Sequence, residues 1–175
     1  MATTLSSKHR QEEEKQLKIA LQGALTLVLS SNFDADSQQC LMTILKIVDN
    51  CLQKPGNVKV RTIRLQNPTF FQKVGQRPGG LAVMQACGFT VQQTSTSLLP
   101  PHSEQSLVLT EAMIDTEWLI TARHMIATCA IQTLGMKPED VPPYKPPPLW
   151  PPPTSTTTTT SSSGGITFDP YKGHR

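Results

Sequence analysis

Proline is concentrated toward the C-terminus, and this limits how much of the chain can fold. Nine of the fifteen prolines lie between residues 138 and 153, and every residue from 154 to 165 is Thr, Ser or Gly. Proline lacks a backbone N–H and fixes φ, so such a segment favours a polyproline II rod over a helix or strand. The Thr/Ser/Gly run is typical of a flexible segment. We therefore expect a folded domain over residues 14–137, a disordered or fraying start over 1–13 and a disordered tail over 138–175.

Charge and apolar content exclude several classes of protein. The chain has 16 Lys and Arg against 13 Asp and Glu, and only 17% of its residues are charged. No basic footprint for nucleic acid stands out, and no run approaches the roughly 20 apolar residues of a membrane span. The polar residues 1–16 do not resemble a secretory signal. We expect a protein of the cytoplasm or nucleus that binds neither nucleic acid nor membrane.

Apolar residues at helical spacing predict three main helices. The first carries Leu17, Leu21, Ala24 and Val28, and the residues from Asp34 to Ser37 offer N-caps for the second. Pro55 and Gly56 end that second helix, and the pair is expected to form a hairpin. The apolar stripe of the second helix is Leu41, Ile44, Leu45, Val48 and Leu52. A last helix begins after a cap at Asp115, steps through Trp118, Ala122, Met125, Cys129 and Thr133, and ends by Gly135.

The centre of the chain predicts shorter elements. Residues 58–65 alternate and are rich in β-branched side chains, which indicates a half-exposed strand. Asn67 followed by Pro68 is typical of a helix start, with proline at the first helical position. Another short helix over residues 81–87 is expected to end at Gly88. Residues 90–106 favour an excursion with at most one short strand, and 107–109 a return strand. The predicted fold class is α+β, a mainly helical bundle with a small two- or three-stranded antiparallel sheet.

No catalytic or metal-binding pattern is present in the sequence. There is no GxSxG, Walker A or HExxH motif, and the four histidines are far apart in the chain. The four cysteines form no CxxC pair and lie among apolar neighbours, which favours reduced core thiols. We expect no enzyme activity, no cofactor and no metal.

Polar residues suited to recognition gather around the predicted strand and the helix after it: Asn50, Arg61, Arg64 and Asn67, with Phe70 close behind. Arginine offers a planar fork to a carboxylate, and asparagine both donates to and accepts from a peptide backbone. Beside an aromatic wall they suit an extended peptide with an acidic or C-terminal end. Spacing alone favours two solvated arginines and an asparagine that only caps a helix.

The stretch from Asp49 and Asn50 through KVRTIRLQNPTF at residues 59–70, followed by Gly79, Gly80 and ACGF at 86–89, resembles the PUB (PUG) domain. That family occurs in cytosolic peptide:N-glycanase, in UBX-type adaptors and in a linear-ubiquitin ligase. Its fold is a helical bundle with a small antiparallel sheet. The resemblance covers roughly residues 14–135.

This resemblance implies an adaptor that docks the C-terminal tail of the valosin-containing AAA ATPase in ubiquitin-proteasome or ER-associated degradation. Asn50, Arg64, Asn67 and Phe70 match positions that form the family's peptide pocket. Val60 departs from the pattern, since an aromatic residue commonly stands there in the glycanases, and this implies weaker stacking on the ligand. The alternative is a scaffold whose PUB-like domain binds a different partner.

Two segments of the tail have the form of linear motifs. Residues 145–151, KPPPLWP, fit the spacing of an SH3 ligand, but such matches are frequent by chance and these prolines favour a rigid spacer. Residues 166–175 regain aromatic side chains, which is typical of a second partner motif or of a segment that folds back on the pocket.

Overall fold

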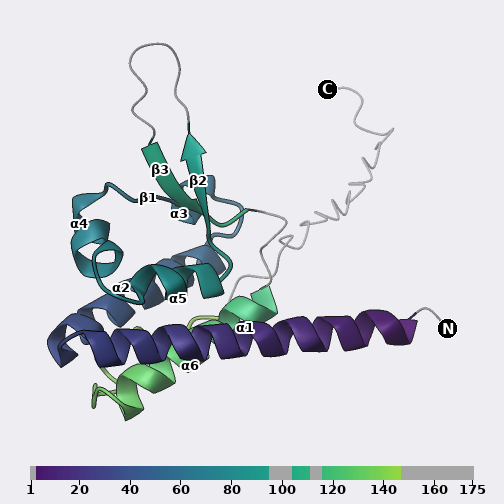
Figure 1. Ribbon diagram of the computed structural model, residues 1–175, viewed down its shortest axis with the longest axis horizontal. Helices are drawn as coiled ribbons and strands as arrows, with labels where there is room; N and C mark the ends of the chain where they lie inside the picture. The colour runs from purple at the N-terminus through teal and green to yellow at the C-terminus, as the bar shows by residue number, and fades with distance from the viewer. Residues whose placement is uncertain (1–2, 95–103, 111–115, 147–175) are drawn as a thin grey trace, which may run out of the picture.

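The computed structural model describes residues 3–94, 104–110 and 116–146 of the chain. Helices dominate them, together with one π-helical turn and one small sheet (Figure 1). This is the predicted α+β class. In chain order the elements are α1 (Thr3–Ser31), α2 (Asp34–Gln53), α3 (Val58–Arg61), β1 (Thr62–Arg64), α4 (Pro68–Phe70), the π turn η1 (Phe71–Gly75), α5 (Gly80–Ala86), β2 (Thr90–Thr94), β3 (Glu104–Val108) and α6 (Thr116–Gln132).

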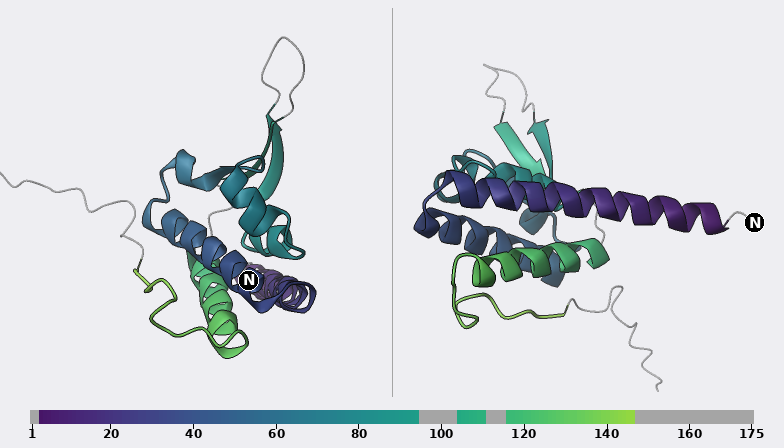
Figure 2. Two further views of the ribbon diagram at one scale, coloured as in Figure 1. Left: turned by 90° about the vertical axis from the view of Figure 1, so that its left-hand side faces the viewer. Right: turned by 60° about the horizontal axis from the view of Figure 1, so that its bottom comes forward.

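The three long helices build the base of the domain. α1 packs mainly on α5, and α2 packs mainly on α6 (Figures 1 and 2). The predicted apolar stripe of α2 is buried along its whole length, and α2 ends two residues before Pro55 as expected. The first half of α1 projects beyond the rest of the domain (Figure 2), and the helix begins eleven residues before the predicted domain start.

The turn between α1 and α2 uses a different cap from the predicted one. Phe33 precedes α2 and makes no side-chain capping bond. The buried Ser37 hydroxyl instead donates to the carbonyl oxygen of Val28 at 3.0 Å, which satisfies an otherwise orphaned acceptor at the end of α1. Asn32 adds two further bonds at the end of α1, because its amide donates to the carbonyl oxygens of Val28 and Pro78.

The sheet has three antiparallel strands in the order β1-β3-β2. Ile63 faces Leu107 across the first pair, and Val91 faces Leu107 across the second. The predicted strand over residues 58–65 is wrong in its first half, which is the helical turn α3. The side chain of Asn57 accepts a hydrogen bond from the backbone of Lys59 at 3.0 Å, and this cap outweighs the β-branched composition.

The connection after α5 holds more strand than predicted. β2 and most of β3 lie in the range for which the sequence allowed one short strand. Their Thr- and Gln-rich composition gives little apolar alternation. The local sequence therefore does not indicate that β3 lies at the centre of the sheet and pairs with both β1 and β2.

Two predicted helix boundaries in the centre are confirmed. Asn67 caps α4 with Pro68 at the first helical position. Gly88, with φ of 100°, ends α5 in a Schellman arrangement in which Gly88 N–H donates to Gln85 and Phe89 N–H donates to Met84. The buried Phe89 ring then joins the core.

α6 buries a broader face than the predicted stripe. Trp118 and Ala122 are buried, whereas Met125 and Cys129 are half-buried and Thr133 is exposed beyond the helix end. The core contacts come also from Leu119, Arg123, Ile126 and Ala130. The predicted cap Asp115 lies outside the described residues. No helix in the described ranges is long and apolar enough to cross a membrane.

The packed chain continues past Lys137, the residue at which the sequence places the end of the domain. Val141 is 7% exposed and belongs to the hydrophobic core. We refer to residues 141–146 as the strap. The strap runs along the surface formed by α2 and α6, so part of the proline-rich segment is integrated into the fold.

Candidate functional site

The five residues predicted to bind a peptide lie on four elements that follow one another. Asn50 is exposed in the last turn of α2, and Val60 is half-buried in α3. Arg64 is exposed at the end of β1, and Asn67 is exposed at the cap of α4. Phe70 is buried at the end of α4.

Two hydrogen bonds connect these elements directly. The Cys51 thiol in α2 donates to the carbonyl oxygen of Val60, with 3.4 Å between sulfur and oxygen. The backbone N–H of Asn67 donates to the carbonyl oxygen of Arg64 at 3.0 Å. The end of α2 is thereby tied to α3, and the end of β1 to the start of α4.

The oxygen and the NH₂ group of the Asn67 side-chain amide have different roles. Its oxygen accepts from the backbone N–H groups of Thr69 at 3.0 Å and Phe70 at 3.3 Å. The NH₂ group remains available to donate. Toward a peptide, this residue therefore offers donors rather than an acceptor.

The predicted aromatic residue, Phe70, is buried, and its neighbour Phe71 is exposed. Phe70 is 4% exposed and lies in the hydrophobic core, so its ring supports the site from beneath. Phe71 is 49% exposed and presents an aromatic surface to solvent. Two adjacent phenylalanines look alike in a sequence, and the rotation of the turn that Asn67 caps decides which of them faces inward.

Arg61 is a structural residue. It is 5% exposed, its Nη1 donates to the carbonyl oxygen of Leu109 at 3.3 Å, and its own carbonyl accepts from Leu109 N–H at 2.9 Å. These bonds hold the end of α3 to the end of β3. Of the two arginines around β1, Arg64 is the exposed one.

The surface around the site is basic. Residues 46–73 contain six Lys and Arg and a single acidic residue, Asp49. That carboxylate pairs with Arg123 of α6, whose Nε donates to Asp49 Oδ1 at 2.7 Å. The uncompensated charge of this segment is therefore positive, which favours acidic partners.

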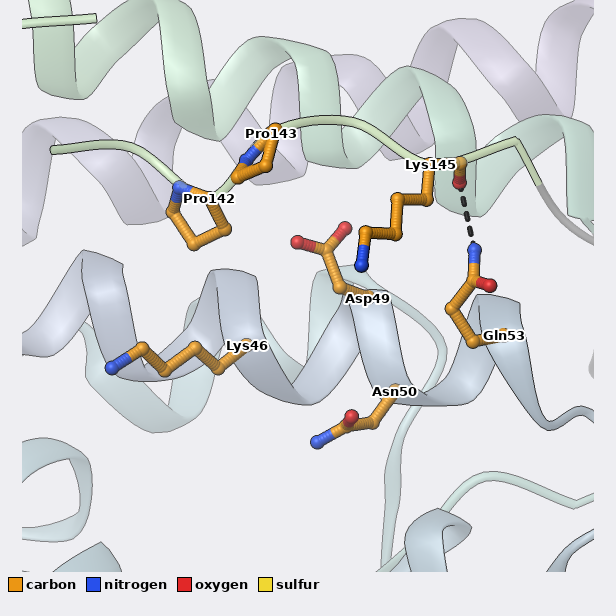
Figure 3. A pocket seen from close by; sticks show the side chains of 7 residues that line it. All are labelled: Lys46, Asp49, Asn50, Gln53, Pro142, Pro143 and Lys145. Atoms are coloured by element: carbon orange, nitrogen blue, oxygen red, sulfur yellow. Dashed lines mark hydrogen bonds between the residues drawn. The ribbon is translucent and has the colours of Figure 1, made fainter. Parts of the chain in front are cut away.

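A pocket of about 390 Å³ opens between the strap and the second half of α2 (Figure 3). Its lining includes Asn50 and six residues that the sequence analysis missed: Lys46, Asp49, Gln53, Pro142, Pro143 and Lys145. No local signal marks them, because the pocket exists only once the strap has folded onto α2.

Side chains of α2 and α6 hold the strap along its length. The Gln53 amide donates to the carbonyl oxygens of Lys145 at 2.8 Å and Pro146 at 3.2 Å. Arg123 donates through Nη2 to the carbonyl oxygen of Pro142, and its guanidinium lies 5.1 Å from the centre of the Tyr144 ring. The first two residues of the predicted SH3-type motif are thus anchored to the domain, and the rest of that motif lies outside the described residues, as does the segment 166–175.

The buried thiols are not nucleophiles at neutral pH. Burial raises the pKa of Cys51 to about 11 and the pKa values of Cys40 and Cys87 to about 12. Within the described ranges, no three His, Cys, Asp or Glu side chains gather in a way that could hold a metal ion.

Comparison with known proteins gives two findings. The model of the PUB domain family matches residues 34–122, which is more than half of the chain. The chain is also similar to UBX domain-containing protein 6 of Caenorhabditis elegans, with 36% identity over 67 residues, covering 38% of this chain but 15% of that protein. Both findings support a protein-interaction adaptor. The matched range begins with α2 and ends within α6, so it includes the elements that carry Asn50, Val60, Arg64 and Asn67. On this evidence the chain belongs to the PUB domain family.

Proposed function

We propose that the chain docks the C-terminal tail peptide of the valosin-containing AAA ATPase and links that ATPase to ubiquitin-proteasome or ER-associated degradation, in the cytoplasm or nucleus. Membership of the PUB family and the similarity to a UBX domain-containing protein support this proposal. The observation that carries it is the exposure of Asn50, Arg64 and Asn67 on connected elements within a basic surface.

The chemistry of these residues suits an acidic peptide. The guanidinium of Arg64 accommodates a carboxylate with two parallel N–H donors. The NH₂ of Asn67 donates to a peptide carbonyl, and Asn50 bonds the backbone in either direction. An apolar or aromatic side chain of the peptide would lie against half-buried Val60 and exposed Phe71, a shallower surface than an aromatic residue at position 60 would provide.

Fluorescence anisotropy with a labelled peptide of the ATPase C-terminal tail tests the proposal. Removal of a charge-assisted bond costs about 1.5–3 kcal/mol, so Arg64→Ala should weaken binding at least about tenfold. Arg64→Lys should recover only part of the loss, since an ammonium lacks the planar fork. Lys15→Ala, on the projecting half of α1, removes one charge away from the site and should leave binding unchanged.

Absence of binding by the intact chain would overturn the proposed partner. Equal affinity of the wild type and a folded Arg64→Ala variant would remove this strand from the site and favour a scaffold that binds a different partner.

A further inference from the structure

The pocket beneath the strap borders the candidate docking site, and Asn50 belongs to both. We propose that this pocket is the subsite for the acidic side chains that precede the end of the docked peptide. The inference rests on the proposed function and extends it, because it assigns a binding role to Lys46 of α2 and Lys145 of the strap.

Charge complementarity supports an acidic occupant. The pocket is lined by two lysines and by Asp49, whose charge is already compensated by the guanidinium of Arg123. Within the described part of the chain, neither Lys46 nor Lys145 pairs with a carboxylate at salt-bridge distance. Both ammonium groups are therefore available to carboxylates from outside.

The strap holds one of these lysines in place before any ligand arrives. Gln53 bonds the carbonyl oxygen of Lys145, and Figure 3 shows the Lys145 side chain extending from the strap toward α2. Pro142 and Pro143 form a rigid apolar wall beside it. A lysine whose backbone is fixed next to an apolar surface binds a carboxylate at a smaller entropic cost than a lysine on a flexible tail does.

The position of Asn50 makes the two sites continuous. In Figure 3 its side chain extends from the flank of α2 that faces away from the strap, while Asp49 and Gln53 point toward the strap. An extended peptide that bonds Asn50 and Arg64 with its last residues would cross α2 here, and its preceding residues would enter the pocket. A volume of about 390 Å³ accommodates carboxylate side chains of this size.

Two peptides and two variants test the subsite by anisotropy. One peptide is the ATPase tail, and the other has every Asp and Glu of that tail replaced by Asn and Gln. The double variant Lys46→Ala/Lys145→Ala should bind the acidic peptide about fivefold more weakly than the wild type, as expected for two partly exposed ion pairs. It should bind the amide peptide as the wild type does. The double variant Lys15→Ala/Lys18→Ala, which likewise removes two positive charges but from α1, is the charge-matched control and should bind both peptides as the wild type does.

The outcomes separate this subsite from the docking function itself. If the wild type binds and the double variant loses nothing, or loses the same factor with both peptides, the pocket is not an acidic subsite and the docking proposal stands. If the wild type binds neither peptide, the proposed function fails and the subsite fails with it. A difference between wild type and double variant that is specific to the acidic peptide and shrinks as salt is raised supports the subsite.

Discussion

At the scale of single residues, Asn67 shows how one side chain serves folding and recognition together. Its oxygen caps α4 and its NH₂ faces outward. The two readings that the sequence left open, a helix cap or a ligand contact, are therefore compatible. Separating them experimentally requires a substitution that keeps the oxygen and removes the donors.

Asn67→Asp makes that separation. Aspartate caps a helix as well as asparagine does, so the Asn67→Asp variant should have the same free energy of unfolding as the wild type. The Asn67→Ala variant should lose about 1 kcal/mol of that free energy. Both variants should bind the acidic peptide more weakly than the wild type does. Asn67→Asp should show the larger loss, because it adds a negative charge to the site. Denaturant melts and anisotropy on the same samples measure the two effects, and unchanged binding by Asn67→Asp would reduce Asn67 to a cap.

At the scale of elements, the ion pair between α2 and α6 organises the strap. Arg123 has a side chain only 4% exposed, yet it contacts the Asp49 carboxylate, the Pro142 carbonyl oxygen and the Tyr144 ring. A buried arginine with this set of partners joins two helices and an extended segment. Its loss leaves a largely buried carboxylate and removes one of the anchors of the strap.

We expect Arg123→Met to lower the free energy of unfolding by about 3 kcal/mol, because it strands Asp49 without a partner. Asp49→Leu alone should also be destabilising, since it leaves the arginine unpaired. The double variant should be less destabilised than the sum of the two single variants. Urea melts of the four proteins provide this cycle, and strict additivity would show that the pair is not coupled.

At the scale of the whole molecule, the two ends of the described chain make unequal contributions. Residues 11–20 of α1 have no buried side chain, and this half of the helix projects past the domain. At the other end, Val141 is buried and the strap is bonded to α2 and α6. Truncation should therefore be tolerated at the start and costly at the end.

A chain beginning at residue 14 should melt within about 2 °C of the full chain, since none of residues 11–20 has a buried side chain. A chain ending at Lys137 should melt several degrees lower, because burial of a valine is worth about 1.5–3 kcal/mol and a change of 1 kcal/mol shifts Tm by roughly 2–8 °C in domains of this size. Thermal melts followed by circular dichroism measure both. Equal melting of the full chain and the chain ending at Lys137 would show that the strap adds nothing to stability.

Much of the fold is predictable from local pattern, and the two main errors have different causes. The stripe of α2, the cap at Asn67 and the left-handed Gly88 follow from spacing and from the conformational preference of single residues. The turn at α3 depends on the local cap of Asn57 on Lys59, which the β-branched composition masks. The full extent of β2 and β3 depends on their pairing with each other across the sheet, which local composition does not report.

The amino-acid sequence by itself determined the helical framework, the short capped helix after β1 and the identity of the polar residues that the site exposes, because periodicity and capping act over a few residues. Only the tertiary structure decided that Arg61 faces inward while Arg64 faces outward, that Phe71 rather than Phe70 meets solvent, and that a proline segment closes a pocket over α2. These outcomes depend on contacts between residues such as Arg123 and Pro142 or Gln53 and Lys145, whose proximity arises only when the helices have packed.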